Sequence, residues 1–320
     1  MSRVVVVGSF NVDHVWTAAA LPRAGETLAG HYAAGPGGKG FNQATAAARA
    51  GAVTAFICAL GDDAGGALAR QLAAGDRIDL RALRSDQATG TAGIYLDHAG
   101  RNCIVIGAGA NAALAAEHVT AHDDAFINAG VVVAQLESPI DAVIAALHAG
   151  RMHGALTLLN PAPANAATSL PLLALTDLLT PNETEFSELI ARHVGERIGS
   201  DAITLDQPRL HSLCRELLPE GSVVVTLGAN GCFVSHADGR LHGDHRAFYR
   251  LDAERVQTID TTGAGDAFNG ALAAAIAGAP ARPLREHLRV AARFAALSTE
   301  RHGAAAAMPT KAEVDARFGD

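Results

Sequence analysis

The residues best suited to chemistry lie late in the chain, in the run DTTGAGDAF at 260–268. Gly263 and Gly265 remove Cβ atoms where the backbone would approach a ligand, and the residues after them are typical of a helix. A helix N-terminus offers unpaired N–H groups and a partial positive charge to an anion. If that anion is a phosphoryl group, Asp266 lies beside it as a general base for an incoming hydroxyl. The alternative is that Asp266 only caps its own helix.

A second group of candidate residues follows the first apolar run. Residues 4–7 are four valines ending at Gly8, which predicts a central parallel strand buried on both faces. Ligands of open α/β sheets bind beyond the carboxyl ends of strands, where Asn11 and Asp13 lie two residues apart and share one face of an extended chain. An amide and a carboxylate together can bind vicinal hydroxyls. Turn formation is the alternative for both residues.

A glycine-rich stretch at 35–40 leads into an alanine-rich helix. It differs from the Walker A motif because Gly40, rather than Ser or Thr, follows Lys39. Glycines before a helix still indicate close backbone approach to something polar. Asn42, one turn into the helix, is placed to face the same site as the second group.

These groups need a scaffold, and the rest of the chain alternates short apolar runs with helical stretches. Repeated strand–turn–helix units predict an α/β fold with a doubly wound, mostly parallel sheet and helices on both faces. Polar residues and glycines fall at the carboxyl ends of the expected strands, the functional edge of such sheets. The expected strands are Val4–Val7, Val53–Ala59, Val131–Gln135, Leu156–Leu159, Leu178–Leu179, Val223–Val225 and Val256–Ile259, the last entering the glycine turn.

A second, smaller sheet is expected from two segments without helical period. One of them carries a hairpin signature, with apolar runs on either side of the turn DHAGR at 97–101. We expect this sheet to stand off the main domain as a lid. The glycines at 107–112 match a dinucleotide fingerprint only weakly, since no acidic strand end follows about 20 residues on. The expected bounds are 13–34 and 91–106 for the lid, and 1–12, 35–90 and 107–320 for the main domain.

Composition limits the possible partners. The 320 residues are 49% hydrophobic, enough for a large core, and the net charge of −8 argues against nucleic acid or an anionic membrane as a partner. No apolar run reaches transmembrane length and no signal peptide precedes the first strand. The four cysteines include no CxxC pair and are expected to be buried, reduced thiols of a cytoplasmic protein. They are Cys58, Cys103, Cys214 and Cys232.

Eight motifs in the same order resemble the ribokinase-like (PfkB) family of sugar kinases, over nearly the whole chain. The forms GGKGxNQA and LNPAPA resemble the ribokinase branch. The motifs are GSFNVD at 8–13, PGGKGFNQA at 36–44, AGANAAL at 108–114, QLESP at 135–139, LNPAPA at 159–164, TPNETE at 180–185, TLGANG at 226–231 and DTTGAGDAF at 260–268.

The resemblance implies an ATP-dependent kinase that phosphorylates the primary hydroxyl of a pentose, with D-ribose the first choice and ribose 5-phosphate the product. Asp266 would be the base, and the turn residues Gly263, Ala264 and Gly265 the anion hole. The sugar contacts implied are Asn11, Asp13, Gly37, Gly38, Lys39, Asn42, Glu137 and Asp266. The nucleotide contacts implied are Asn182, Glu185, Thr226, Gly228, Ala229, Gly231 and Gly265.

Two cations and a second copy of the chain are also implied. Asn182 and Glu185, three residues apart and hence expected on one helical face, would orient water bound to Mg²⁺. A potassium ion would be held by backbone carbonyls and a carboxylate, with Arg301 or a water filling the gap as the alternative. The matching residues are Asp260, Thr262, Ser298, Arg301, Gly303 and Ala307. The family's lids commonly pair, which implies a homodimer through an outer lid face with Trp16, Tyr95 and Ile104 as candidates.

The chain departs from the family pattern at three places. Phe41 replaces a small residue, which would either change the size of the sugar pocket or pack beneath the loop. Ala292 stands where an Asn or His usually touches the nucleotide, which puts the adenine contacts in doubt. The segment Leu241 to Glu254 is longer and more polar than the family leads us to expect.

Other functional classes explain the sequence less well. A nicotinamide-dependent oxidoreductase would need its fingerprint after the first strand rather than after a hairpin. A non-catalytic sugar sensor would not need an intact Asp266. Within the kinase class, fructose or a nucleoside is the alternative substrate.

Overall fold

The computed structural model describes residues 3–199, 202–240 and 242–319. The ends of the expected main domain, Met1, Ser2 and Asp320, lie outside the described residues, as does Leu241. Across the described stretches, no helix has the length and apolar character needed to cross a membrane.

A nine-stranded sheet forms the centre of the molecule, in the order β13-β12-β11-β10-β9-β8-β1-β4-β5. The strands from β11 to β5 are parallel, whereas β12 and β13 join antiparallel at one edge. The mostly parallel sheet expected from the sequence is therefore confirmed. The strands are β1 (Arg3–Val7), β4 (Val53–Gly61), β5 (Asp79–Ser85), β8 (Ala129–Ala134), β9 (Leu156–Leu159), β10 (Leu178–Leu179), β11 (Ser222–Thr226), β12 (Cys232–Ser235) and β13 (Phe248–Leu251).

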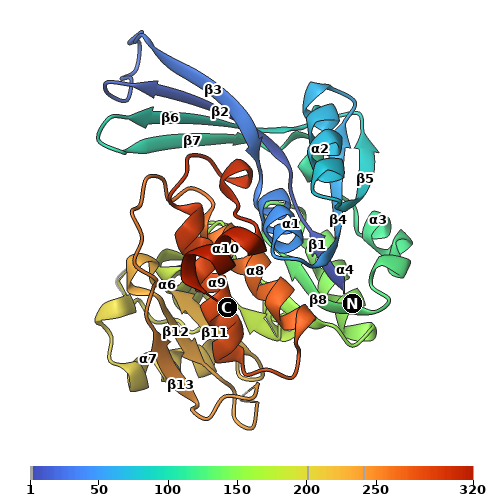
Figure 1. Cartoon of the computed structure of the whole chain (residues 1–320), viewed down its shortest axis with the longest axis vertical. Coiled ribbons are helices and arrows are strands. Elements are labelled where there is room, and N and C mark those ends of the chain that lie inside the picture. Colours follow the sequence, from blue (N-terminus) through green and yellow to red (C-terminus); the bar gives the residue numbers. More distant parts are fainter. Residues whose placement is uncertain (1–2, 200–201, 241, 320) are drawn as a thin grey trace.

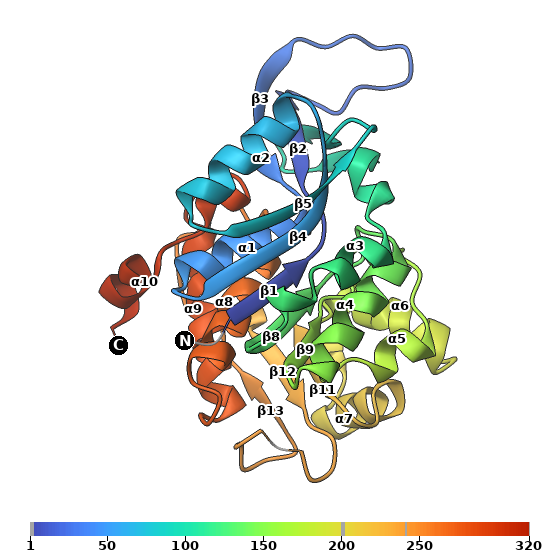
Figure 2. The same cartoon turned by 90° about the vertical axis from the view of Figure 1, so that its right-hand side faces the viewer.

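Helices cover both faces of this sheet, as Figure 2 shows. The valines of β1 alternate between two apolar cores, with Val4 and Val6 in one and Val5 and Val7 in the other. One core is closed by α1 (Lys39–Arg49), α2 (Ala64–Gly75), α8 (Ala264–Gly278) and α9 (Leu284–Ser298). The other is closed by α3 (Ala116–Ala121), α4 (Ile140–Met152), α5 (Leu170–Ala174), α6 (Glu183–His193) and α7 (Gln207–Leu217), while α10 (Lys311–Phe318) packs on α9.

A four-stranded sheet in the order β3-β2-β6-β7 projects from the main body (Figure 1). It consists of β2 (Asn11–Ala18), β3 (Gly30–Gly37), β6 (Gly90–Asp97) and β7 (Asn102–Gly107), so the expected small sheet is present. Trp16 lies opposite Tyr32 and Tyr95 in the register, and its ring lies 5.3 Å from each of theirs. Ile104 lies opposite Ile94 and therefore on the other face. The expectation of one face carrying Trp16, Tyr95 and Ile104 is wrong.

Two other sequence expectations are wrong. Residues 256–259 form no strand: the sheet already ends at β13, and Ile259 is 55% exposed in a loop. Cys103 is exposed because β7 is the edge strand of the small sheet, whereas Cys58, Cys214 and Cys232 are buried free thiols as expected.

The polar segment that begins at Leu241 now has a structural explanation. Its described part supplies β13 and the buried Asp244, which accepts hydrogen bonds from the hydroxyl of Tyr249 and the backbone N–H of Arg285. His236 Nε2 lies 3.0 Å from the same carboxylate. The segment thus ties the edge of the sheet to the start of α9.

Candidate active site

The glycine turn sets the start of α8. Gly263 adopts a left-handed conformation with φ 76° as the residue before the helix, and a Cβ there would also crowd Ala304 at 3.0 Å. The first helical N–H groups, including those of Gly265 and Asp266, have no acceptor within the helix. A Cβ built on Gly265 meets open space. The turn therefore leaves these N–H groups accessible to an anion.

Asp266 lies inside α8 and does not cap it. Its side chain is only 6% exposed, and it points across to α1. Asn42 Nδ2 donates to Oδ2 at 2.9 Å, and Gln43 Nε2 donates to Oδ1 at 2.8 Å. The structure therefore does not support simple helix capping as the reason for this residue.

The junction of β1 and β2 packs against the glycine-rich start of α1. A Cβ on Gly37 would lie 2.1 Å from Oδ2 of Asp13, and a Cβ on Gly38 would lie 2.7 Å from the backbone N of Asn11. The main chain thus lies so close to both polar residues that a Cβ at position 37 or 38 would clash with them. Asn11 and Asp13 lie in β2 and share one face, so the turn alternative is wrong.

Glu137, which follows β8, joins this junction to α1. Its Oε2 accepts a hydrogen bond from Ser9 Oγ at 2.6 Å and another from the backbone N–H of Lys39 at 3.0 Å. Three segments distant in sequence therefore meet beside Asp266.

One lysine lies among four carboxylates at this place. Burial alone would lower the pKa of Lys39, but Asp266, Glu137, Glu185 and Asp13 together raise it above its usual value. The lysine is therefore firmly charged.

Two carboxylates of this cluster, Asp13 and Asp266, are harder to ionise than usual. Burial, with help from Glu137 and Asp266, raises the pKa of Asp13 to about 7. Burial also raises the pKa of Asp266, against the opposing effects of Lys39, Asn42 and Gln43. Perturbed carboxyl groups of this kind gather at catalytic sites.

Asn182 and Glu185 form a reciprocal cap rather than a pair on one helical face. Asn182 is the residue before α6, its Oδ1 accepts from the N–H of Glu185 at 2.8 Å, and Glu185 Oε2 accepts from the N–H of Asn182 at 2.8 Å. The expectation of one helical face was wrong because the helix begins only at Glu183. Burial is the main cause that raises the pKa of Glu185.

The expected nucleotide loop lies next to this cap. The N–H of Thr226 donates to Pro181 O at 2.9 Å, so β11 ends beside the start of α6. Gly228 and Gly231 have φ of 55° and 80°, and Ala229 between them is exposed. A Cβ on Gly231 would lie 1.9 Å from Leu251 O, so β13 fixes the shape of this loop.

Asp260 joins two of the residues expected at the cation site, Thr262 and Gly303. Its carboxylate accepts from the N–H of Thr262 and from the N–H of Gly303, both at 2.9 Å. These bonds lower its pKa against the opposing effect of burial. Arg301 bonds Glu313 instead at 2.6 Å, so it does not fill the space between the loops. Ser298 ends α9 and is buried, as is Ala307.

The sequence reading missed several side chains that hold the site together. Asn111 donates from Nδ2 to Asn11 Oδ1 at 2.8 Å, and Ser9 bonds Glu137. Gln43, Gln135 and Asn160 form a further buried chain. Each of these residues lies inside one of the family motifs, and that membership was the available signal.

Phe41 does not line the site. It is 1% exposed, and its ring lies 5.1 Å from that of Phe10 and 5.9 Å from that of Phe56. Of the two alternatives for this departure, packing beneath the loop is the one observed.

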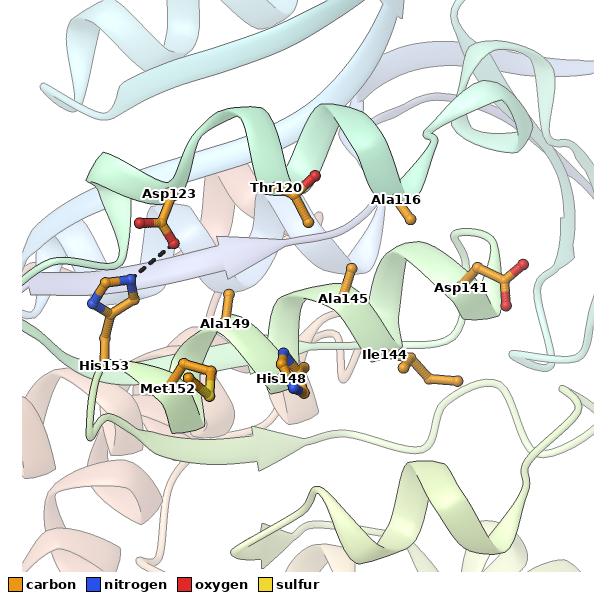
Figure 3. A pocket seen from close by; sticks show the side chains of 10 residues that line it. All are labelled: Ala116, Thr120, Asp123, Asp141, Ile144, Ala145, His148, Ala149, Met152 and His153. Atoms are coloured by element: carbon orange, nitrogen blue, oxygen red, sulfur yellow. Dashed lines mark hydrogen bonds and ion pairs between the residues drawn. The ribbon is translucent and has the colours of Figure 1, made fainter.

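The site is distinct from a groove of about 650 Å³ between α3 and α4 (Figure 3). The groove is lined by alanines, Ile144, Met152 and His148, and His153 bonds Asp123 across one end. It shares no residue with the cluster around Asp266.

The comparisons with known proteins agree with these motifs. Residues 1–311 match the pfkB family of carbohydrate kinases. The chain is 35% identical to a ribokinase of Haemophilus influenzae over 97% of its own length and 96% of the relative's. It is 37% identical to a bifunctional ribokinase/ribose-5-phosphate isomerase A of Fructilactobacillus sanfranciscensis, of which it spans 55%.

Solved structures show the same fold. A ribokinase of Giardia lamblia superposes with a TM-score of 0.87 at 27% identity, covering 99% of this chain and 98% of the other. An Arabidopsis thaliana ribokinase complexed with ribose and ATP gives a TM-score of 0.83 at 30% identity, with coverage of 98% and 97%.

Proposed function

Because this chain belongs to the pfkB family of carbohydrate kinases, we propose that it transfers the γ-phosphoryl group of ATP to the primary hydroxyl of D-ribose. Relatives named ribokinase and a similar structure that holds ribose and ATP support this choice of substrates. The observation that carries the proposal is the buried Asp266 carboxylate beside the open N-terminal turn of α8.

The chemistry follows from that placement. Asp266 takes the proton of the sugar hydroxyl, whose oxygen forms a bond to the γ-phosphorus while the bond from phosphorus to the β,γ-bridging oxygen breaks. The products are ribose 5-phosphate and ADP. The turn Gly263, Ala264 and Gly265 stabilises the charge on the transferring group, chiefly through the N–H groups of Gly263 and Gly265, since the N–H of Ala264 also donates to Thr261 O at 3.2 Å.

The sugar lies between β2 and the start of α1 in this proposal. Asp13 and Asn11 bind vicinal hydroxyls, and the backbone of Gly37 and Gly38 approaches the ring. The buried Oδ1 of Asn42 has no hydrogen-bond partner among the described residues, and in this proposal it accepts a hydrogen bond from a sugar hydroxyl. Lys39 and Glu137 complete the contacts from the other side.

The nucleotide occupies the neighbouring edge of the sheet. Thr226, Gly228, Ala229 and Gly231 form its loop, and Gly265 meets its terminal phosphate. Mg²⁺ usually keeps several waters and binds phosphate oxygens. The side-chain oxygens of Asn182 and Glu185 already accept hydrogen bonds from each other's backbone N–H groups, so the pair would hold the ion through its waters. The described residues include no group of three or more His, Cys, Asp or Glu side chains that could hold a metal. Magnesium supplies charge neutralisation on the phosphates when bound.

A monovalent cation fits the loops joined by Asp260. The donors are hard oxygens, and Arg301 is engaged elsewhere. Potassium would be held by Asp260, Thr262, Ser298, Arg301, Gly303 and Ala307, through backbone carbonyls except for the Asp260 carboxylate. When bound, it stiffens the glycine turn whose N–H groups face the phosphoryl group.

The small sheet acts as the lid that excludes water from the site, and its apolar faces associate with a second copy of the chain. Exposed apolar side chains lie on both faces, among them Trp16, Tyr95, Ile104 and Val105. A sheet of this size does not bury two faces by itself. Sedimentation at micromolar concentration should give the mass of a dimer; a strictly monomeric mass contradicts this part of the proposal.

Substrate choice is tested by measuring ATP turnover with ribose, fructose, 2-deoxyribose, adenosine and inosine. We expect the highest kcat/KM with ribose. A higher kcat/KM with fructose or a nucleoside would overturn the choice of ribose but not the kinase class. No sugar-dependent ADP release with any of the five would overturn both.

A further inference from the structure

Behind Asp266 lies a chain of side-chain amides that no substrate contact explains. Gln43 Nε2 donates to Asp266 Oδ1 at 2.8 Å and to Asn160 Oδ1 at 3.1 Å. Gln43 Oε1 accepts from Gln135 Nε2 at 2.7 Å. Asn160 Nδ2 in turn donates to the backbone carbonyl of Thr180 at 3.1 Å. Gln43 and Gln135 are 0% exposed.

The direction of this chain is fixed by chemistry. An ionised carboxylate only accepts hydrogen bonds, so Gln43 must turn its NH₂ group toward Asp266. Its carbonyl then faces Gln135, which must present its own NH₂ group. A flipped Gln43 would set its carbonyl against the carboxylate and lose both donors. Gln135 therefore holds Gln43 in the only orientation that serves Asp266.

At the far end of this hydrogen-bonded chain of amides, one buried oxygen of the described residues is left without a partner, which destabilises the protein. Gln135 Oε1 is buried without a hydrogen-bond partner among the described residues, and leaving a buried acceptor unpaired costs about 1–3 kcal/mol. It lies where a Cβ on Gly8 would come within 2.1 Å. Glycine at position 8 thus leaves room for the Gln135 amide.

We propose that Gln43, backed by Gln135, is a positioning residue for phosphoryl transfer that fixes the direction of the Asp266 carboxylate toward the sugar hydroxyl. Asn42, the other amide on Asp266, leaves its carbonyl unpaired among the described residues, whereas both hydrogens and the carbonyl of Gln43 are used within the protein. The inference rests on the proposed role of Asp266 as base.

The test compares Gln43→Met, Gln135→Met and the control Gln71→Met, which changes an exposed glutamine of α2. Gln43→Met should lower kcat roughly 10- to 100-fold, the cost of a misplaced catalytic group, with both KM values within about threefold of wild type. The acid limb of kcat should move up by about one pH unit because the ionised carboxylate loses a donor. The other charged groups that face Asp266, namely Asp13, Lys39, Glu137 and Glu185, are unchanged in every variant.

Gln135→Met should lower kcat by roughly 3- to 10-fold and move the acid limb in the same direction as Gln43→Met. The double variant should have a kcat no lower than that of Gln43→Met, since the two glutamines act through one chain of hydrogen bonds. If Gln43→Met does not fold, as judged by thermal melting, Gln135→Met alone decides. A kcat within threefold of wild type with an unmoved acid limb overturns the inference. So does a lower kcat with an unmoved acid limb, or a raised sugar KM at unchanged kcat.

Asp266→Asn, measured in parallel, separates this inference from the proposed function. If Asp266→Asn is inactive while both glutamine variants behave like wild type, only the positioning role fails. If Asp266→Asn keeps more than a tenth of wild-type turnover, the assignment of the base fails first.

Discussion

Two aspartates, six residues apart at the two ends of one glycine turn, occupy opposite environments. Asp266 is buried, and burial raises its pKa despite two side-chain amides from α1. Asp260 lies in a loop, where burial would raise its pKa but hydrogen bonds from the backbone N–H groups of Gly303 and Thr262 lower it overall. The first environment favours the protonated carboxyl group, and the second favours the charged carboxylate.

The comparison shows that residue type alone does not assign a role. Both aspartates belong to the motif DTTGAGDAF, and both neighbour the same glycine turn. The two aspartates differ in their hydrogen-bond partners. Asp266 accepts from side chains of the packed helix α1, whereas Asp260 accepts from main-chain N–H groups of two loops. A general base needs a tuned pKa and a fixed direction, whereas a cation site needs negative charge and oxygen donors.

The largest effect is expected at Asp266. Asp266→Asn should keep sugar affinity within about threefold, because an amide of the same shape retains the local packing, and should lower kcat by roughly 10² to 10⁴. Affinity can be followed by the fluorescence of Trp16, the single tryptophan, which lies in the small sheet. Turnover above a tenth of wild type would show that Asp266 is not the base.

A smaller loss is expected at the other end of the turn. Asp260→Ala should lower kcat by roughly tenfold by freeing the loop that carries Gly303, and should leave the acid limb of the pH profile in place. The measurement is kcat from pH 5 to 9 beside Asp266→Asn. An acid limb that moves in Asp260→Ala would mean that the two carboxylates are not separate in function.

The cation itself is the next test. Wild-type kcat in potassium should exceed that in tetramethylammonium several-fold, at equal ionic strength and saturating magnesium, because the bulky ion cannot enter between the loops. Asp260→Ala serves as the control and should show no such preference. Equal rates of the wild type in the two salts would mean that the site is absent or without effect.

The smallest effect concerns Asp13, where burial raises the pKa from 3.8 to about 7. Between these values the native state binds more protons than the unfolded chain, so the stability of the sugar-free protein falls as pH rises through this range. Asp13→Asn is neutral throughout. Its melting temperature relative to wild type should therefore be roughly 2–4 °C higher at pH 8 than at pH 5. A pH-independent difference would show that Asp13 titrates normally.

Local sequence determined most of the scaffold. The valines at 4–7 and the repeated strand–helix pattern predicted a mostly parallel sheet, because continuous apolar runs need cover on both faces. The hairpin at 91–106 predicted the second sheet. The run Val256–Ile259 misled because β-branched residues form a strand only where the tertiary structure pairs them with a neighbouring strand, and the sheet ends at β13, before this run.

The motifs also located the polar residues that meet at the site, but not their bonds. Hydrogen bonds that join positions 43 and 266, or 9 and 137, depend on how distant segments pack, and spacing along the chain holds no record of that. The pKa values follow from the same packing, since burial is their largest cause. The sequence thus determined which residues are candidates for the chemistry, and the tertiary structure alone decided which aspartate is buried among amides and which is held by loops.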